Sequence, residues 1–212
     1  MSSFSQKEIK CPCCEKSLQL RLLRGFFSPG PFGLDGNPHQ PEIFETVQIC
    51  PNCGYASRRM LQPVDTAKTE MVESNEYQEL FRSEQYDLTV RKFLLAAKLD
   101  EMSGDHYHAA GNALIAEWYL QDQDQKDIGV LKETIAYLSK SLKTNADVPQ
   151  AIALVDCLRR AEMYKESKDA ARELMQHVRD DRILTILGYE IQLAEKQDAK
   201  PHLQEDANEN IK

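Results

Sequence analysis

The spacing of apolar residues predicts that most of the chain is helical. From about residue 86 onward apolar positions recur every three or four residues, which is typical of a helix with one buried face. Such stripes predict helices that begin near residues 87, 107, 127, 147, 164 and 181. At the fourth of these starts, Asp147 is a suitable N-cap and Pro149 is tolerated in the first turn. The clearest stripe consists of Ile128, Leu131, Ile135, Leu138 and Leu142.

The distance between predicted helix starts indicates that the helices form pairs. Successive starts are about 17 to 20 residues apart, so a helix pair repeats after about 34 to 40 residues. This range is typical of stacked helical hairpins such as tetratricopeptide repeats, whose period is 34. Residues 158–174 resemble the middle of such a repeat, although Ala161 stands where Gly is usual. A plain helical bundle has the same stripes, so both arrangements remain open.

The first 62 residues have a different pattern. Apolar and polar residues alternate over 18–22 and again over 43–49, which predicts two short strands. The residues between them, Arg24–Pro41, are rich in Gly and Pro and are expected to form a loop. Either the apolar residues of this loop fold back as core for the strands, or they form a hydrophobic docking surface for a partner. These residues are Phe26, Phe27, Phe32 and Leu34.

Two Cys-x-x-Cys pairs, separated by 35 residues, are the most specific signal in the chain. A Cys-x-x-Cys turn directs two thiolates at one point, and zinc takes four such ligands in a tetrahedron. Gly54 follows the second pair and permits the positive φ that closes the turn. Glu15 stands at the equivalent place in the first pair, at a cost of about 1–2 kcal/mol that the ~10–16 kcal/mol of zinc binding offsets. The sequence predicts one structural zinc ion with four ligands: Cys11, Cys14, Cys50 and Cys53.

Three other roles compete with zinc binding for these cysteines: an iron site, disulfide bonds and a redox motif. An iron site of rubredoxin type uses the same four thiolates. Disulfides are disfavoured because no secretory signal is visible and the cytosol is reducing, and a redox Cys-x-x-Cys needs no second copy. Cys13 is an alternative first-pair ligand that suits the turn less well. Cys157 lies in a helical stripe and is expected to be a core residue.

These patterns define the expected organisation. Residues 1–62 are a zinc-ribbon-like metal-binding module, residues 63–196 a helical repeat-like domain, and residues 197–212 a flexible tail, with a boundary in the turn at Pro63. The fold class is therefore mainly α: a small N-terminal β zinc ribbon followed by a tetratricopeptide-like array of helical hairpins. A module of about 60 residues has a small core, so the metal is expected to supply much of its stability.

The order of these motifs resembles the bacterial proteins of domain of unknown function 2225, over roughly residues 8–180. The resemblance implies four metal-binding cysteines, which map to Cys11, Cys14, Cys50 and Cys53, and tetratricopeptide-like helices; it implies no activity. Glu15 and the loop rich in Gly and Pro depart from the usual pattern. The segments that carry the resemblance are the two cysteine pairs, Leu88–Phe93 and Ala109–Tyr119.

No catalytic constellation is visible, so an enzyme is not expected. The chain has no phosphate-binding loop, no His-Glu-x-x-His and no nucleophile elbow. His39 is expected to be a loop residue, and His106 with His108 an exposed helix start, because residues two apart diverge on a helix. We expect Trp118 in the core and Glu117 as a solvated or groove-facing charge.

Composition limits the location and the partners. The net charge is −8 and no apolar run approaches the ~20 residues of a membrane helix, so a cytoplasmic protein without a membrane partner is expected. The favoured function is a zinc-binding adaptor that binds a protein segment in a concave helical array. The alternative is nucleic-acid contact through basic residues of the ribbon, which the acidic helices oppose. The basic residues are Lys16, Arg21, Arg24, Arg58 and Arg59. The sequence specifies neither the partner nor the oligomeric state.

Overall fold

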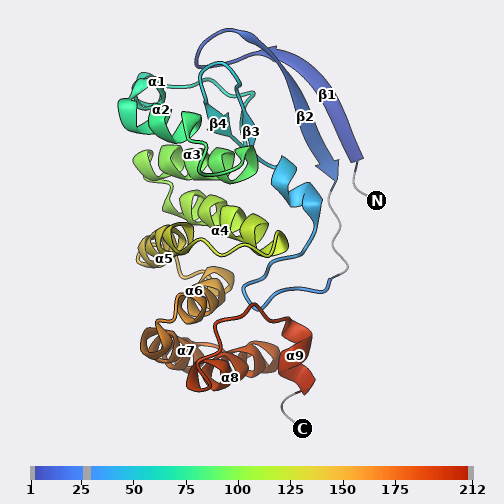
Figure 1. Cartoon of the computed structure of the whole chain (residues 1–212), viewed down its shortest axis with the longest axis vertical. Helices are drawn as coiled ribbons and strands as arrows, with labels where there is room; N and C mark the ends of the chain where they lie inside the picture. The colour runs from blue at the N-terminus through green and yellow to red at the C-terminus, as the bar shows by residue number, and fades with distance from the viewer. Residues whose placement is uncertain (1–2, 26–29, 210–212) are drawn as a thin grey trace. The chain divides into compact units, whose positions relative to one another are not determined.

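The computed structural model describes residues 3–25 and 30–209 and confirms the predicted fold class. Small strands come first and helices make up most of the remaining chain (Figure 1). The chain divides into two compact units that are described here one at a time. The first comprises Met1–Ser28 with Gln40–Leu120, and the second Pro29–His39 with Gln121–Lys212. The predicted boundary at Pro63 lies inside the first unit, because contacts continue from the strands into the helices that follow them.

Two antiparallel hairpins carry the cysteine pairs. β1 (Ser3–Lys10) pairs with β2 (Ser17–Gly25), and β3 (Gln48–Ile49) pairs with β4 (Ala56–Ser57). The alternation over residues 18–22 correctly predicted β2. β1 was not predicted because its few apolar residues are too widely spaced to give a strand pattern.

The strand predicted over residues 43–49 is wrong for most of its length. Residues Pro41–Glu45 form a 3-10 helix, η1, and only Gln48 and Ile49 are in a strand. Pro41 occupies the first turn of η1, where its fixed φ and missing N–H are tolerated. Phe44 is buried and packs edge-on against the ring of Tyr119, with ring centroids 5.1 Å apart. This aromatic contact favours a tight turn over a continued strand.

Two helices that the sequence pattern did not predict follow the second hairpin: α1 (Thr66–Glu73) and α2 (Asn75–Arg82). Each begins with a side-chain cap, since Asp65 and Ser74 accept hydrogen bonds from backbone N–H groups of the first turn. Val72 is the only buried residue of α1, and Tyr77 the only one of α2. Helices with a single buried position leave almost no periodic signal in the sequence.

The remaining long helices begin within one residue of the predicted positions. Asp147 accepts a hydrogen bond from the backbone N–H of Gln150, and Pro149 lies in the first turn, both as predicted. Asp87, Asp127 and Asp180 cap other helices in the same way. The helices are α3 (Leu88–Met102), α4 (His106–Asp122), α5 (Ile128–Leu142), α6 (Val148–Arg160), α7 (Tyr164–His177) and α8 (Asp181–Glu195).

In the second unit consecutive helices from α5 to α8 pack against one another, and α6 also packs against α8. Their shared core includes Val155, Ala171, Val178 and Leu187. Within the described residues, no helix combines the length and the apolar character that a bilayer-spanning helix requires.

The loop that leaves β2 supplies core to the second unit. For its described residues, the alternative that the loop folds back as core for the strands is therefore wrong. Leu34 is 1 % exposed and packs with Ile186, Tyr189 and Leu193 of α8. Burial of the Leu34 side chain in this cluster removes its apolar surface from water, which stabilises the packing of the loop on α8. Phe26 and Phe27 lie outside the described residues.

The chain after α8 also differs from the expectation of a flexible tail. It ends in a short helix, α9 (Gln204–Glu209), whose Ala207 is fully buried beside Leu34. The backbone N–H of Leu34 donates to the carbonyl of His202 at 2.9 Å, and Gly33 forms a β-bridge with Leu203. The loop and the tail therefore hold each other against α8.

A buried group of charged side chains lies beneath these segments. Arg159, with no exposed surface, donates to Glu190 and to Asp156 at 2.5 Å each, and also to the carbonyls of Asp198 and Lys200 at 2.8 Å. These bonds tie the tail to α6 and α8, and a pair buried this completely is costly to break from one side. Burial, with the nearby charge of Asp156, raises the pKa of Glu190 to about 8.

Candidate metal centre

The two cysteine pairs form turns with the same backbone hydrogen bonds. Cys11 donates its N–H to the carbonyl of Lys16, and its own carbonyl accepts from Glu15. In the second pair Cys50 donates to the carbonyl of Tyr55 and accepts from Gly54, and all four distances are 2.9 Å. Glu15 and Gly54 have φ of 61° and 81°, as the sequence predicted for the residue that closes each turn.

The four predicted ligands come together at one point. Their sulfur atoms all lie within 4.8 Å of one another, with 3.8 Å between Cys11 and Cys53 and 3.7 Å between Cys14 and Cys50. Four sulfurs about 2.3 Å from a tetrahedral ion are about 3.8 Å apart along each edge, so the cluster has the size of a metal–tetrathiolate site. The same separations are far longer than the ~2.05 Å of a disulfide bond.

Polar groups around the cluster favour thiolates. The backbone N–H of Cys13 donates to the sulfur of Cys11 at 3.4 Å, and the side-chain amide of Asn52 donates to that of Cys50 at 3.9 Å. Burial raises the pKa of Cys11 to about 11 and also raises that of Cys53. The pKa of Cys50 is lowered, because N–H groups of Cys53 and Asn52 outweigh the effect of burial. Since four adjacent thiols resist losing all their protons, a bound cation is what stabilises the fully ionised set.

The second turn rests directly on α2. Tyr77 donates its hydroxyl hydrogen to the carbonyl of Gly54 at 3.0 Å, and Gln78 donates to the carbonyl of Cys53 at 2.9 Å. A Cβ atom on Gly54 would lie 2.6 Å from the ring of Phe81. Gly54 is thus required by its backbone angle and by the close approach of α2. The turns and the first helices form one structure, which explains why the predicted boundary at Pro63 does not separate two units.

The other cysteines lie outside the cluster. Cys13 is half-buried within the first turn but is not one of the four clustered residues, and Cys157 is fully buried in α6, as expected for a small core residue. The histidines do not converge on a further metal site. Nδ1 of His39, His106 and His108 lies 2.7–2.9 Å from a carboxylate oxygen in each case, and the three carboxylates belong to different residues: Asp122, Glu101 and Asp105.

Two residues of α4 differ from the expectation. Glu117 is 2 % exposed, so it is not a solvated charge, and Trp118 is only half-buried. Glu117 and Trp118 are neighbours on α4 and face different directions. The apolar pattern of α4 is only weakly one-sided, so the sequence did not show which of the two residues faces the core.

The predicted basic residues of the ribbon mostly have partners within the chain. Arg21 lies over the ring of Phe4, with its guanidinium 4.1 Å from the ring centroid, and also 3.8 Å from Glu45. Arg24 donates to the hydroxyl of Ser5 at 2.7 Å. Their contacts hold these two arginines against the hairpin. Arg58 and Arg59 lie farther along, after β4.

Comparisons of the chain with protein-family models, with curated proteins and with solved structures found no match.

Proposed function

We propose that this protein is a zinc-binding adaptor: one zinc ion fixes the N-terminal turns, and the helical hairpins bind a segment of another protein. The metal part rests on the four sulfur atoms, which lie within 4.8 Å of one another and include two pairs, at 3.7 and 3.8 Å, that match the edge of a zinc–tetrathiolate tetrahedron. Four thiols that form no disulfide suit a reducing compartment, which supports a cytoplasmic location.

The binding part rests on an apolar cavity in the second unit, and this observation carries the proposal. The cavity has a volume of about 410 Å³, and its apolar lining comes from α6, from α8 and from the loop that leaves β2: Ile152, Ile183, Ile186, Phe32 and Leu34. The direct packing of α6 on α8 is the contact expected between the first helices of successive hairpins, the face that repeat proteins use for binding. Asp180 and Arg182 lie at the edge of the cavity, where polar groups can orient a bound segment.

The resemblance to the bacterial proteins of domain of unknown function 2225 is part of the same proposal. It is supported by the spacing of Cys11, Cys14, Cys50 and Cys53 and by their convergence in the fold. The resemblance implies four metal-binding cysteines and tetratricopeptide-like helices, and it implies no activity.

Affinity capture from lysate with the full-length protein tests the adaptor role. Ile183→Glu places a charge in the apolar cavity and should abolish capture of the proteins that wild type retains after nuclease treatment. Leu88→Glu is the matched control, because Leu88 is 50 % exposed and lies in the first unit. Both variants should keep the wild-type circular dichroism spectrum. Capture that depends on nucleic acid, or that Ile183→Glu leaves unchanged, would contradict the proposal.

A further inference from the structure

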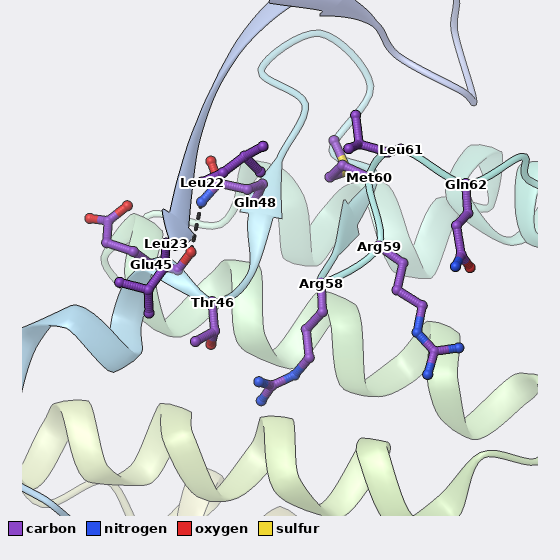
Figure 2. A pocket seen from close by; sticks show the side chains of 10 residues that line it. All are labelled: Leu22, Leu23, Glu45, Thr46, Gln48, Arg58, Arg59, Met60, Leu61 and Gln62. Atoms are coloured by element: carbon purple, nitrogen blue, oxygen red, sulfur yellow. Dashed lines mark hydrogen bonds between the residues drawn. The ribbon is translucent and has the colours of Figure 1, made fainter. Parts of the chain in front are cut away.

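The first unit contains a second cavity, of about 380 Å³, between the end of β2 and the segment that follows β4. Figure 2 shows Leu22 and Leu23 at one side and the segment 58–62 at the other; the side chains of Arg58 and Arg59 extend away from Leu61 and diverge from each other. Leu61, which is 53 % exposed, adds apolar surface, whereas Met60 also lines the cavity but is only 2 % exposed. Two guanidinium groups next to apolar side chains are suited to a ligand that carries both kinds of group.

The side chain of Arg58 is held in position by a hydrogen bond to α4. Its Nε donates to the side-chain oxygen of Asn112 at 2.8 Å, and Asn112, which has no exposed surface, donates in turn to Asp100 at 2.8 Å. A guanidinium has five N–H donors, so four donors of Arg58 remain for a ligand. Neither Arg58 nor Arg59 forms an ion pair with any residue that the structure describes. Arginine donors fixed in this way form strong, oriented hydrogen bonds with a carboxylate.

The surrounding charges favour isolated carboxylates over a polyanion. Glu45 is the only acidic residue that lines the cavity, and it lies beside Arg21. On the other side of the two arginines, Asp100 and Asp105 line a smaller polar cavity. Those acidic groups repel every negative charge of a ligand, so they disfavour a chain of phosphates more strongly than a ligand with one or two carboxylates.

The edge of β2 adds a second recognition element. The backbone N–H of Arg21 donates to the side-chain oxygen of Gln48 at 3.2 Å, so the backbone of Arg21 faces away from β1. Backbone directions alternate along an antiparallel strand, and from this we infer that Leu23, the last residue before the register shift opposite Ser3 and Phe4, presents its N–H and C=O on the same outer side. Leu23 also lines the cavity. An open strand edge of this kind pairs with an extended peptide.

We propose that this cavity binds an extended acidic peptide segment, which pairs with β2 at Leu23 and places a carboxylate against Arg58 and Arg59. An apolar side chain of the same segment packs on the exposed Leu61. The site lies entirely within the first unit and does not depend on the cavity between α6 and α8, so either proposal can fail without the other.

Fluorescence anisotropy with the full-length, zinc-loaded protein tests this site. The probe is a labelled hexapeptide of alternating Val and Glu, and its matched control has Gln in place of Glu. Two further probes carry backbone N-methyl groups on the valines or on the glutamates, and labelled oligouridine is the nucleic-acid comparator. The protein variants are Arg58→Gln and Arg59→Gln, with Arg172→Gln as control because Arg172 is exposed in α7 of the second unit.

The acidic probe should bind saturably, and either arginine variant at the site should weaken it by about ten-fold to a hundred-fold, as expected for charge-assisted hydrogen bonds. Arg172→Gln should bind like wild type, and one of the two N-methylated probes should lose binding. The proposal is overturned if the acidic probe does not bind by about 1 mM. Equal binding of the Gln probe, tighter binding of oligouridine, or full binding of both N-methylated probes would overturn it as well.

Discussion

Replacing Gly54 by Ala tests how closely the second cysteine turn is packed against α2. The φ of Gly54 is +81°, and an added Cβ would lie 2.6 Å from Cγ of Phe81. Holding Ala in the left-handed region costs about 1–2 kcal/mol. Displacing the Phe81 ring adds the cost of overpacking, about 1–3 kcal/mol. We therefore expect Gly54→Ala to lower the free energy of unfolding by about 2–5 kcal/mol.

Gly104→Ala separates the two contributions. Gly104 also has positive φ, +75°, but an added Cβ there meets no atom within 4 Å. This control should lose only the backbone part, about 1–2 kcal/mol. Chemical denaturation of the zinc-loaded full-length proteins measures both values. An equal loss of stability in the two variants would refute the close contact between the turn and Phe81, and with it the argument that strands and helices form one unit.

Three further predictions follow from the same geometry. Cys50→Ser should abolish stoichiometric metal binding, whereas Cys13→Ser should retain it; equal metal loss in elemental analysis would mean that the first turn is assigned wrongly. Glu15→Gly should raise the free energy of unfolding by about 1 kcal/mol, because Glu15 has φ of 61°; a decrease in a denaturant titration would show that its side chain has a role. Burial first, and the charge of Asp105 second, raise the pKa of Asp100 to about 6, so its contribution to stability falls as pH rises from about 4 through 6. Asp100→Asn removes this pH dependence. The difference in free energy of unfolding, variant minus wild type, should therefore be about 1–2 kcal/mol larger at pH 7.5 than at pH 4, after allowance for the solvent contact of Asp100. Denaturation curves at both pH values measure it.

The sequence predicted those features that depend on local pattern. Helix starts were located within a residue because aspartate caps coincide with the beginning of apolar stripes, as at Asp147. The four cysteines that converge were selected because Cys-x-x-Cys spacing itself forms the turn, and the positive φ of Glu15 and Gly54 was expected for the same reason. α1 was missed because a helix with one buried residue, Val72, has no periodic pattern to detect.

Contacts between residues far apart in the chain could not be predicted from local sequence patterns. Leu34 packs against apolar residues of α8, which lie about 150 residues farther along the chain. The anchoring of Arg58 by Asn112 likewise joins residues 54 positions apart. A signal for the buried charges did exist, since Glu190 interrupts the apolar stripe of α8, but its partner Arg159 becomes evident only in the fold.

The central claim is that Cys11, Cys14, Cys50 and Cys53 hold one zinc ion. Elemental analysis of the purified full-length protein, prepared without added metal, tests this claim most directly. We expect close to one equivalent of zinc per chain. One equivalent of iron, or well under one equivalent of any metal in a protein that remains folded, would contradict the account.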